Sequence, residues 1–100
     1  MTFTVLVDRD AQRDFEEIEA WLDSHAPEQT SRFIDDFADT LDAIARHPLL
    51  RPEIRPGARR ESMRVFRYHL WYRVLPEIEH AEVFAVLHDR RGPNALANRL

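Results

Sequence analysis

The chain has 100 residues, 44% of them hydrophobic and 32% charged, with a formal net charge of −4 at pH 7; this balance is typical of one globular domain. It contains no cysteine, which excludes disulfides, thiolate metal sites and cysteine nucleophiles. No apolar run reaches the roughly 20 residues of a membrane span, and residues 1–7 lack the basic leader of a signal peptide, so we expect a single cytoplasmic domain over residues 1–100.

The first half of the chain predicts a strand and two helices. Residues 3–7 form a β-rich run of strand length. Asp8 and Asp10 are candidate N-caps for an amphipathic helix over residues 11–23. Pro27 suits the first turn of a second amphipathic helix, which must end before Pro48. The outer, exposed face of this second helix is expected to carry Asp35, Asp36, Asp39 and Asp42.

The second half of the chain predicts a loop and then strands. Residues 47–61 contain three prolines and a glycine, which indicate a loop that can end in a short strand. The apolar residues then recur with a period of two, which predicts strands over residues 62–67, 69–75 and 81–88, with a turn over residues 76–80. The last strand is apolar on both faces, as a central strand is. The order β-α-α-β-β-β predicts an α+β fold in which a helical hairpin covers one face of a small, mostly antiparallel sheet.

Charge is distributed unevenly along the chain. Residues 1–45 carry three arginines against twelve acidic residues, whereas residues 46–73 carry eight arginines against two. Every basic residue is arginine, whose guanidinium group makes bidentate contacts with phosphates and carboxylates. Two interpretations remain open for the cluster in the loop, which is either a binding surface or a solvated segment paired with the acidic helices. The cluster consists of Arg51, Arg55, Arg59 and Arg60.

Side chains alternate between the two faces of the strand predicted over residues 69–75. The apolar set should face the helices, and it consists of Leu70, Tyr72 and Val74. The opposite set is expected to form an exposed, concave face, and it consists of His69, Trp71 and Arg73. Arginine beside aromatic side chains on that face can make cation–π or base-stacking contacts.

Five segments of the chain form an ordered pattern. They are Ala11, Asp14, Phe15, Ile18 and Trp21; Phe33 and Ile34 through Leu41 and Ile44 to His47 and Pro48; Arg64 four residues before Tyr68; Tyr68 with Tyr72, Arg73 and Val74; and Val86, Leu87 and His88 with Arg90 and Arg91. Together they resemble the RelE/ParE superfamily of type II toxin–antitoxin toxins. Asp14-Phe15 and the ending His88-Asp89-Arg90-Arg91 are closer to its ParE-like branch.

The resemblance implies a toxin with one of two activities, held by a cognate antitoxin protein in a hetero-oligomer. A ParE-like toxin inhibits DNA gyrase and is not an enzyme. A RelE-like toxin is an endoribonuclease that cleaves messenger RNA in the ribosome. A third hypothesis is a non-toxic protein of the same fold that acts as a binding partner or co-regulator. No cofactor and no membrane partner is expected, and the histidines lack the spacing of metal ligands.

Each activity has its own candidate residues. For target binding we expect the arginines and the tryptophan of the strands and the C-terminal end, namely Arg64, Trp71, Arg73, Arg90 and Arg91. A metal-free ribonuclease needs a base, a cationic clamp and an acid, for which the candidates are Arg60, Arg64, His69, His88 and Arg90. Residues 92–100 contain no Tyr, His or Lys, whereas the resemblance implies that RelE-like enzymes often carry one there. This difference favours the ParE-like function.

Overall fold

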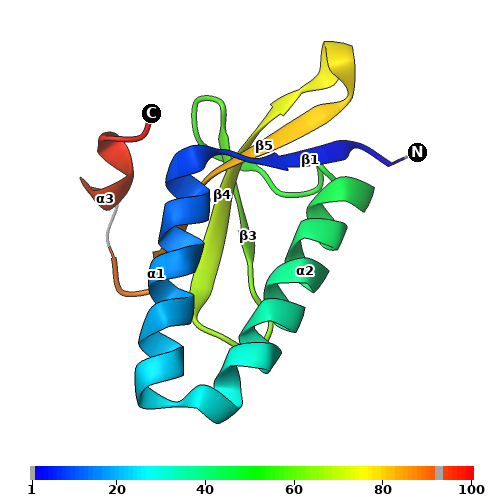
Figure 1. The fold of residues 1–100 in the computed structure, drawn as a ribbon. Coiled ribbons are helices and arrows are strands. Elements are labelled where there is room, and N and C mark those ends of the chain that lie inside the picture. The colour runs from blue at the N-terminus through cyan, green and yellow to red at the C-terminus, as the bar shows by residue number, and fades with distance from the viewer. Residues whose placement is uncertain (1, 92–93) are drawn as a thin grey trace.

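The computed structural model describes residues 2–91 and 94–100. Five strands form one sheet in the order β1-β5-β4-β3-β2, in which β1 runs parallel to β5 and the other neighbours are antiparallel. The strands are β1 (Thr4–Val7), β2 (Glu53–Arg55), β3 (Ala58–Ser62), β4 (Tyr68–Leu75) and β5 (His80–His88). The helices are α1 (Arg9–His25), α2 (Thr30–Arg46) and the short α3 (Asn94–Ala97). The long helices form a hairpin on one side of the sheet, while α3 stands apart from that hairpin (Figure 1).

The first strand and both long helices confirm the prediction. Asp8 is the N-cap of α1, and its carboxylate accepts the backbone N–H of Ala11 at 2.9 Å. Pro27 lies in a separate 3₁₀ turn, Pro27–Gln29, so α2 begins at Thr30 rather than at the proline. The second helix ends at Arg46, before Pro48, as expected. None of the helices in the described ranges combines the length and the hydropathy of a membrane span.

The predictions for residues 47–67 are confirmed only in part. A short strand, β3, does end the segment that was predicted as a loop, but residues 53–55 form a strand as well, and the hairpin β2–β3 turns at Gly57 with a φ of +76°. Residues 63–67 are not a strand but the connection between β3 and β4. The predicted strands 62–67 and 69–75 left only Tyr68 between them, and one residue cannot reverse an antiparallel pair. The strand that pairs with β4 therefore lies earlier in the chain, at Ala58–Ser62, and Ser62 lies opposite His69.

The sheet separates two apolar cores. The larger core lies under the hairpin and contains Leu70 and Tyr72, as the alternation of β4 predicted. A bulge in β5 leaves Phe84 without a partner in β4 and turns both Phe84 and Ala85 toward the other face. There they pack with Trp71 and with Leu96 of α3. The expectation that Trp71 is exposed is therefore wrong, because this second core leaves it only 8% exposed.

Candidate functional site

A pocket of about 390 Å³ opens on the face of the sheet that points away from the helical hairpin. It is lined by Ile54, Arg55, Arg60, Trp71, Leu87, Arg91 and Leu96. Three of these residues are arginines, four are apolar or aromatic, and none is acidic. We call this site the basic pocket. It offers positive charge around an apolar floor, which suits an anion that carries an apolar group.

Neighbouring strands place the tryptophan and one arginine of the basic pocket face to face. Arg60 of β3 pairs with Trp71 of β4, and its guanidinium carbon lies 5.5 Å from the centroid of the Trp71 ring. This is within the range of a cation–π contact. The contact holds Arg60 against Trp71 in the lining of the pocket without neutralising its charge.

The C-terminal segment closes one side of the basic pocket. Leu96 of α3 is 1% exposed and packs against Trp71 and Leu87. Arg99 anchors this segment with two hydrogen bonds to the Asp14 carboxylate, at 2.7 and 2.9 Å, which raise the pKa of Arg99 above its ordinary value. No role for Leu96 or Arg99 was predicted from the sequence. The available signal was Leu96 in a short helix-forming run, Asn94–Ala97. Met1, Gly92 and Pro93 lie outside the described residues.

The predicted target-binding residues lie in four different places. Trp71 and Arg91 meet in the basic pocket, together with Arg60 from the ribonuclease candidates. Arg73 lies farther along β4, where it pairs with Glu82 at 3.1 Å and stacks 4.3 Å over the ring of Phe84. Arg90 is exposed in the turn after β5.

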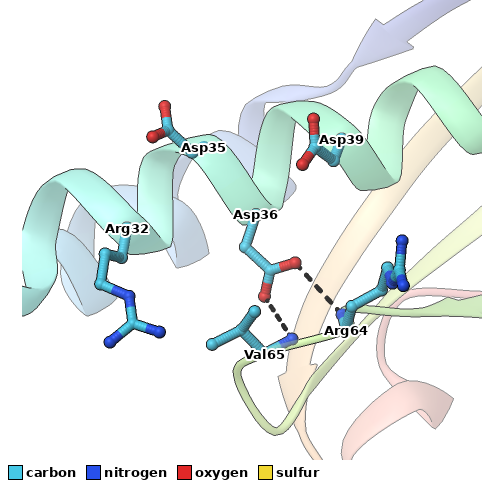
Figure 2. Close-up of a pocket in the computed structure, with 6 residues that line it drawn as sticks. All are labelled: Arg32, Asp35, Asp36, Asp39, Arg64 and Val65. Atoms are coloured by element: carbon cyan, nitrogen blue, oxygen red, sulfur yellow. Dashed lines mark hydrogen bonds between the residues drawn. The ribbon is translucent and has the colours of Figure 1, made fainter.

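Arg64 belongs to a different surface, beside α2. The prediction that it lies in a strand is wrong, because residues 63–67 are a loop. Arg64 lines an acidic groove of about 420 Å³, shown in Figure 2, together with Arg32, Asp35, Asp36, Asp39 and Val65. Arg64 therefore does not join the other arginines in the basic pocket.

Asp36 is the residue that fixes this loop. The expectation that it lies exposed on the outer face of the helix is wrong, since it is only 4% exposed. Its carboxylate points from α2 toward the loop (Figure 2) and accepts the backbone N–H groups of Arg64, Val65 and Phe66 at 3.1, 2.9 and 2.9 Å. The Asp36 carboxylate thus provides hydrogen-bond acceptors for three backbone N–H groups in the connection between β3 and β4, which have no partner in the described sheet.

The two candidate histidines face opposite sides of the sheet. His69 pairs with Leu87 on the face of the basic pocket, whereas His88 pairs with Tyr68 and stacks edge-on against its ring at 5.2 Å. Tyr68 packs on the core under the hairpin. The two imidazoles therefore do not converge on one phosphate, which a general acid and base pair would require.

Both histidines make hydrogen bonds within the chain. His69 Nδ1 lies 2.9 Å from Ser62 Oγ, and its Nε2 lies 2.8 Å from Asp89 Oδ1. The hydrogen bond with His69 is the main reason that the pKa of Asp89 lies below its ordinary value. His88 Nδ1 accepts the backbone N–H of Arg90 at 3.0 Å. Within residues 2–91 and 94–100, no group of three or more His, Asp or Glu side chains is placed to hold a metal ion.

The four loop arginines lie in two different settings, and none of them pairs with an acidic residue of a helix in the contacts of the described residues. Arg55 and Arg60 line the basic pocket. Arg51 pairs with Glu61 of β3 at 3.1 Å rather than with an acidic helix, and Arg59 donates to the backbone oxygen of Arg51. Two of the four therefore support the local structure of the loop, and two contribute charge to the pocket.

A family model described as the ParE toxin of the type II toxin–antitoxin system, parDE, matches residues 5–93. Among solved structures, the chromosomal ParDE system from P. aeruginosa is similar with a TM-score of 0.74, at 15% identity, over 87% of this chain and 96% of that chain. The toxin–antitoxin complex RelBE2 from Mycobacterium tuberculosis is similar with a TM-score of 0.59, at 24% identity, over 88% and 99%.

The free E. coli toxin RelE is similar with a TM-score of 0.58, at 14% identity, over 90% of this chain and 86% of that chain. At these identities the structural matches show a shared fold. No curated protein matches the chain in sequence.

Proposed function

We propose that this chain, which belongs to the family of ParE toxins of type II toxin–antitoxin systems, inhibits DNA gyrase by binding and is neutralised by a cognate antitoxin. The family match covers residues 5–93 and so spans both the helical hairpin and the sheet. It supports the ParE-like function over the RelE-like one.

The observation that carries a binding function is the composition of the basic pocket. It collects Arg55, Arg60 and Arg91 around Trp71 and contains neither a histidine nor a carboxylate. Such a pocket can bind an anionic surface but lacks the general acid and base of a metal-free ribonuclease. We therefore propose Arg60, Trp71 and Arg91 as the centre of the surface that contacts the target, with Arg73 and Arg90 at its edge.

An antitoxin partner is supported by the complexes of similar fold, since one of them is a toxin–antitoxin complex. The outer side of the helical hairpin also exposes large apolar groups, with Trp21 57% and Ile34 40% exposed. These side chains offer apolar surface that a protein partner can bury. We propose that the antitoxin covers them in the assembled module.

The alternative function is a ribosome-dependent mRNA endoribonuclease of the RelE type. The feature that favours it is the same set of arginines, because guanidinium groups also bind phosphates. The catalytic candidates would then be Arg60 and His69 on the face of the basic pocket and Arg90 in the turn after β5, whereas His88 lies on the opposite face and Arg64 lines the acidic groove beside α2.

Expression of the chain alone, followed by pulse-labelling of DNA and protein synthesis in one culture, distinguishes the hypotheses. Gyrase inhibition should stop DNA synthesis first and induce a DNA-damage response. Early loss of protein synthesis would instead support the ribonuclease. Normal labelling of both, with soluble protein present, would support the non-toxic binding partner.

The same cultures test the basic pocket. The double variant Arg60→Ala, Arg91→Ala should lose toxicity, because both changes remove positive charge from the pocket. Arg46→Ala is the matched control, since its exposed partner Asp42 lies on α2. Unchanged toxicity of the double variant at equal protein level would place the contact surface elsewhere.

A further inference from the structure

Three side chains near the basic pocket form a hydrogen-bonded series that the proposed toxin function does not use. Ser62 ends β3, His69 lies opposite it in β4, and Asp89 follows β5. Ser62 Oγ lies 2.9 Å from His69 Nδ1, and His69 Nε2 lies 2.8 Å from Asp89 Oδ1. A hydroxyl, an imidazole and a carboxylate connected in this order are the arrangement that activates a serine nucleophile. We call these residues the serine relay.

The Asp89 carboxylate determines which nitrogen of His69 carries the proton. An ionised carboxylate only accepts hydrogen bonds, so a neutral His69 must hold its proton on Nε2, facing Asp89. The pKa of Asp89 lies below its ordinary value, chiefly because of the hydrogen bond with His69, and the carboxyl is therefore ionised at neutral pH. Nδ1 then presents its lone pair to Ser62, and the Ser62 hydroxyl donates to it. The imidazole is thus oriented to remove the Ser62 proton.

The backbone holds the serine relay in place and leaves the serine accessible. Ser62 and His69 are directly paired across β3 and β4. The backbone N–H of Asp89 donates to Arg67 O at 2.8 Å, which fixes the residue after β5. The His69 side chain is only 14% exposed, whereas Ser62 is exposed. A reagent can therefore reach the nucleophile while the base stays packed.

The basic pocket begins one row farther along the same face. Residues two apart in a strand share a face and lie roughly 6.6 Å apart. Arg60 precedes Ser62 by two positions in β3, and Trp71 follows His69 by two positions in β4. Leu87 connects the two sites, because it is paired with His69 across the strands and also lines the basic pocket. A small molecule that reaches Ser62 can therefore place a negative group among the arginines.

We propose that Ser62 is the nucleophile of a second activity, the hydrolysis of small carboxylic esters whose acyl part carries a negative charge bound in the basic pocket. This activity does not depend on gyrase inhibition. The Asp89 carboxylate and the His69 imidazole supply the base, and Arg60 supplies positive charge on the same strand as the nucleophile.

The reaction has two steps. Ser62 Oγ bonds to the ester carbon while its proton passes to His69 Nδ1, and the carbon–oxygen bond to the alcohol then breaks. The departing alkoxide takes the proton from His69 and leaves as the alcohol. Water next attacks the acyl-Ser62 ester while His69 accepts its proton and returns it to Ser62 Oγ. The carboxylic acid is released, and the serine relay is restored.

The test uses the purified full-length chain and two kinds of probe. A fluorophosphonate reagent should modify Ser62, with loss of fluoride, and peptide mass spectrometry locates the modified residue. p-Nitrophenyl hemisuccinate, which is anionic, should be hydrolysed faster than neutral p-nitrophenyl acetate. Circular dichroism shows that each variant remains folded.

The variants separate nucleophile, base and pocket. Ser62→Ala should abolish labelling and reduce ester hydrolysis to the rate without the protein, because the nucleophile is lost, while the exposed Ser31→Ala on α2 should change neither. Asp89→Asn should slow labelling of Ser62, because an amide can orient His69 in the wrong tautomer. Arg60→Ala with Arg91→Ala should remove the preference for the anionic ester.

Two results would overturn the proposal. One is a folded chain whose Ser62 is labelled no faster than Ser31. The other is ester hydrolysis that persists unchanged in the Ser62→Ala variant. Neither result bears on gyrase inhibition, which is measured separately.

Discussion

Among single residues, Tyr72 shows how burial in the core disfavours the ionised form of a side chain. Burial raises its pKa from the ordinary 10.0 to about 12, with a smaller contribution from the nearby Glu61 carboxylate. Its hydroxyl donates to Pro48 O at 3.0 Å and so ties β4 to the segment after α2. An ionised Tyr72 would lose this donor and place a charge in the core.

The free energy of unfolding should therefore fall as the pH rises from 10 to about 12. Below pH 10 the tyrosine is neutral in both the folded and the unfolded chain, and its contribution is complete. Between pH 10 and about 12 the unfolded chain ionises first, which favours unfolding. The chain has no lysine and only two tyrosines, so few other groups titrate there. Urea denaturation across this interval measures the slope.

Tyr72→Phe should flatten that slope, although it also loses the hydrogen bond to Pro48. Tyr68→Phe is the comparison, because burial raises the pKa of Tyr68 as well. In the Tyr68→Phe variant, the free energy of unfolding should still fall with pH because Tyr72 is present. Equal slopes in Tyr72→Phe and the unaltered chain would show that Tyr72 is not the responsible group.

Asp36 is the second residue with a specific prediction. Its carboxylate accepts three backbone N–H groups, and an amide in its place would turn a donor toward them. Asp36→Asn should lower the free energy of unfolding by about 1–3 kcal/mol, the cost of leaving a buried polar group unsatisfied. Asp35→Asn, on the exposed side of α2, should have little effect. Equal unfolding midpoints for the two variants would contradict this role.

At the scale of elements, the helices and strands with a strong apolar periodicity were predicted correctly from the sequence. The two amphipathic helices, β4 and the central strand β5 agree with the sequence because each carries a long, regular apolar pattern. The hairpin β2–β3 was predicted only as a loop with a short strand at its end, because both strands are short and rich in charged residues and because Pro52, Pro56 and Gly57 next to β2 are typical of a loop. The bulge at Phe84 could not be predicted, since it depends on the register between two strands.

The candidate site was predicted in part for the same reason. Alternation correctly placed His69 and Trp71 on one face and thereby indicated the side of the basic pocket. It could not show that α3 covers Trp71, or that Asp36 is buried, because both depend on segments far apart in the sequence. His69 contacts both Ser62 and Asp89, and its pairing with Ser62 depends on the observed position of β3, which ends at Ser62 instead of beginning there.

The short helix α3 should contribute measurably to stability despite its length. Leu96 is 1% exposed in the second core, whereas Leu100 in the same segment is 56% exposed. Leu96→Ala should cost about 2–5 kcal/mol, as other buried leucines do, and Leu100→Ala should cost far less. Thermal unfolding of the two variants makes the comparison. A Leu96→Ala variant as stable as Leu100→Ala would mean that α3 does not pack on the sheet in solution.

At the scale of the whole molecule, the two faces of the sheet differ in charge. The helical hairpin carries most of the acidic residues, and the opposite face carries the basic pocket. The proposed binding of an anionic surface is compatible with a net charge of −4, because a local field depends on nearby charges rather than on their total. We expect one face to contact the target and the hairpin to contact the antitoxin.

The most direct test of this account is a supercoiling assay with purified gyrase, relaxed plasmid and increasing amounts of the purified chain. We predict a dose-dependent loss of supercoiling and an accumulation of cleaved DNA, both weakened in the Arg60→Ala, Arg91→Ala double variant and unaffected by Arg46→Ala. Complete supercoiling at a molar excess of a chain that still arrests growth would contradict gyrase inhibition.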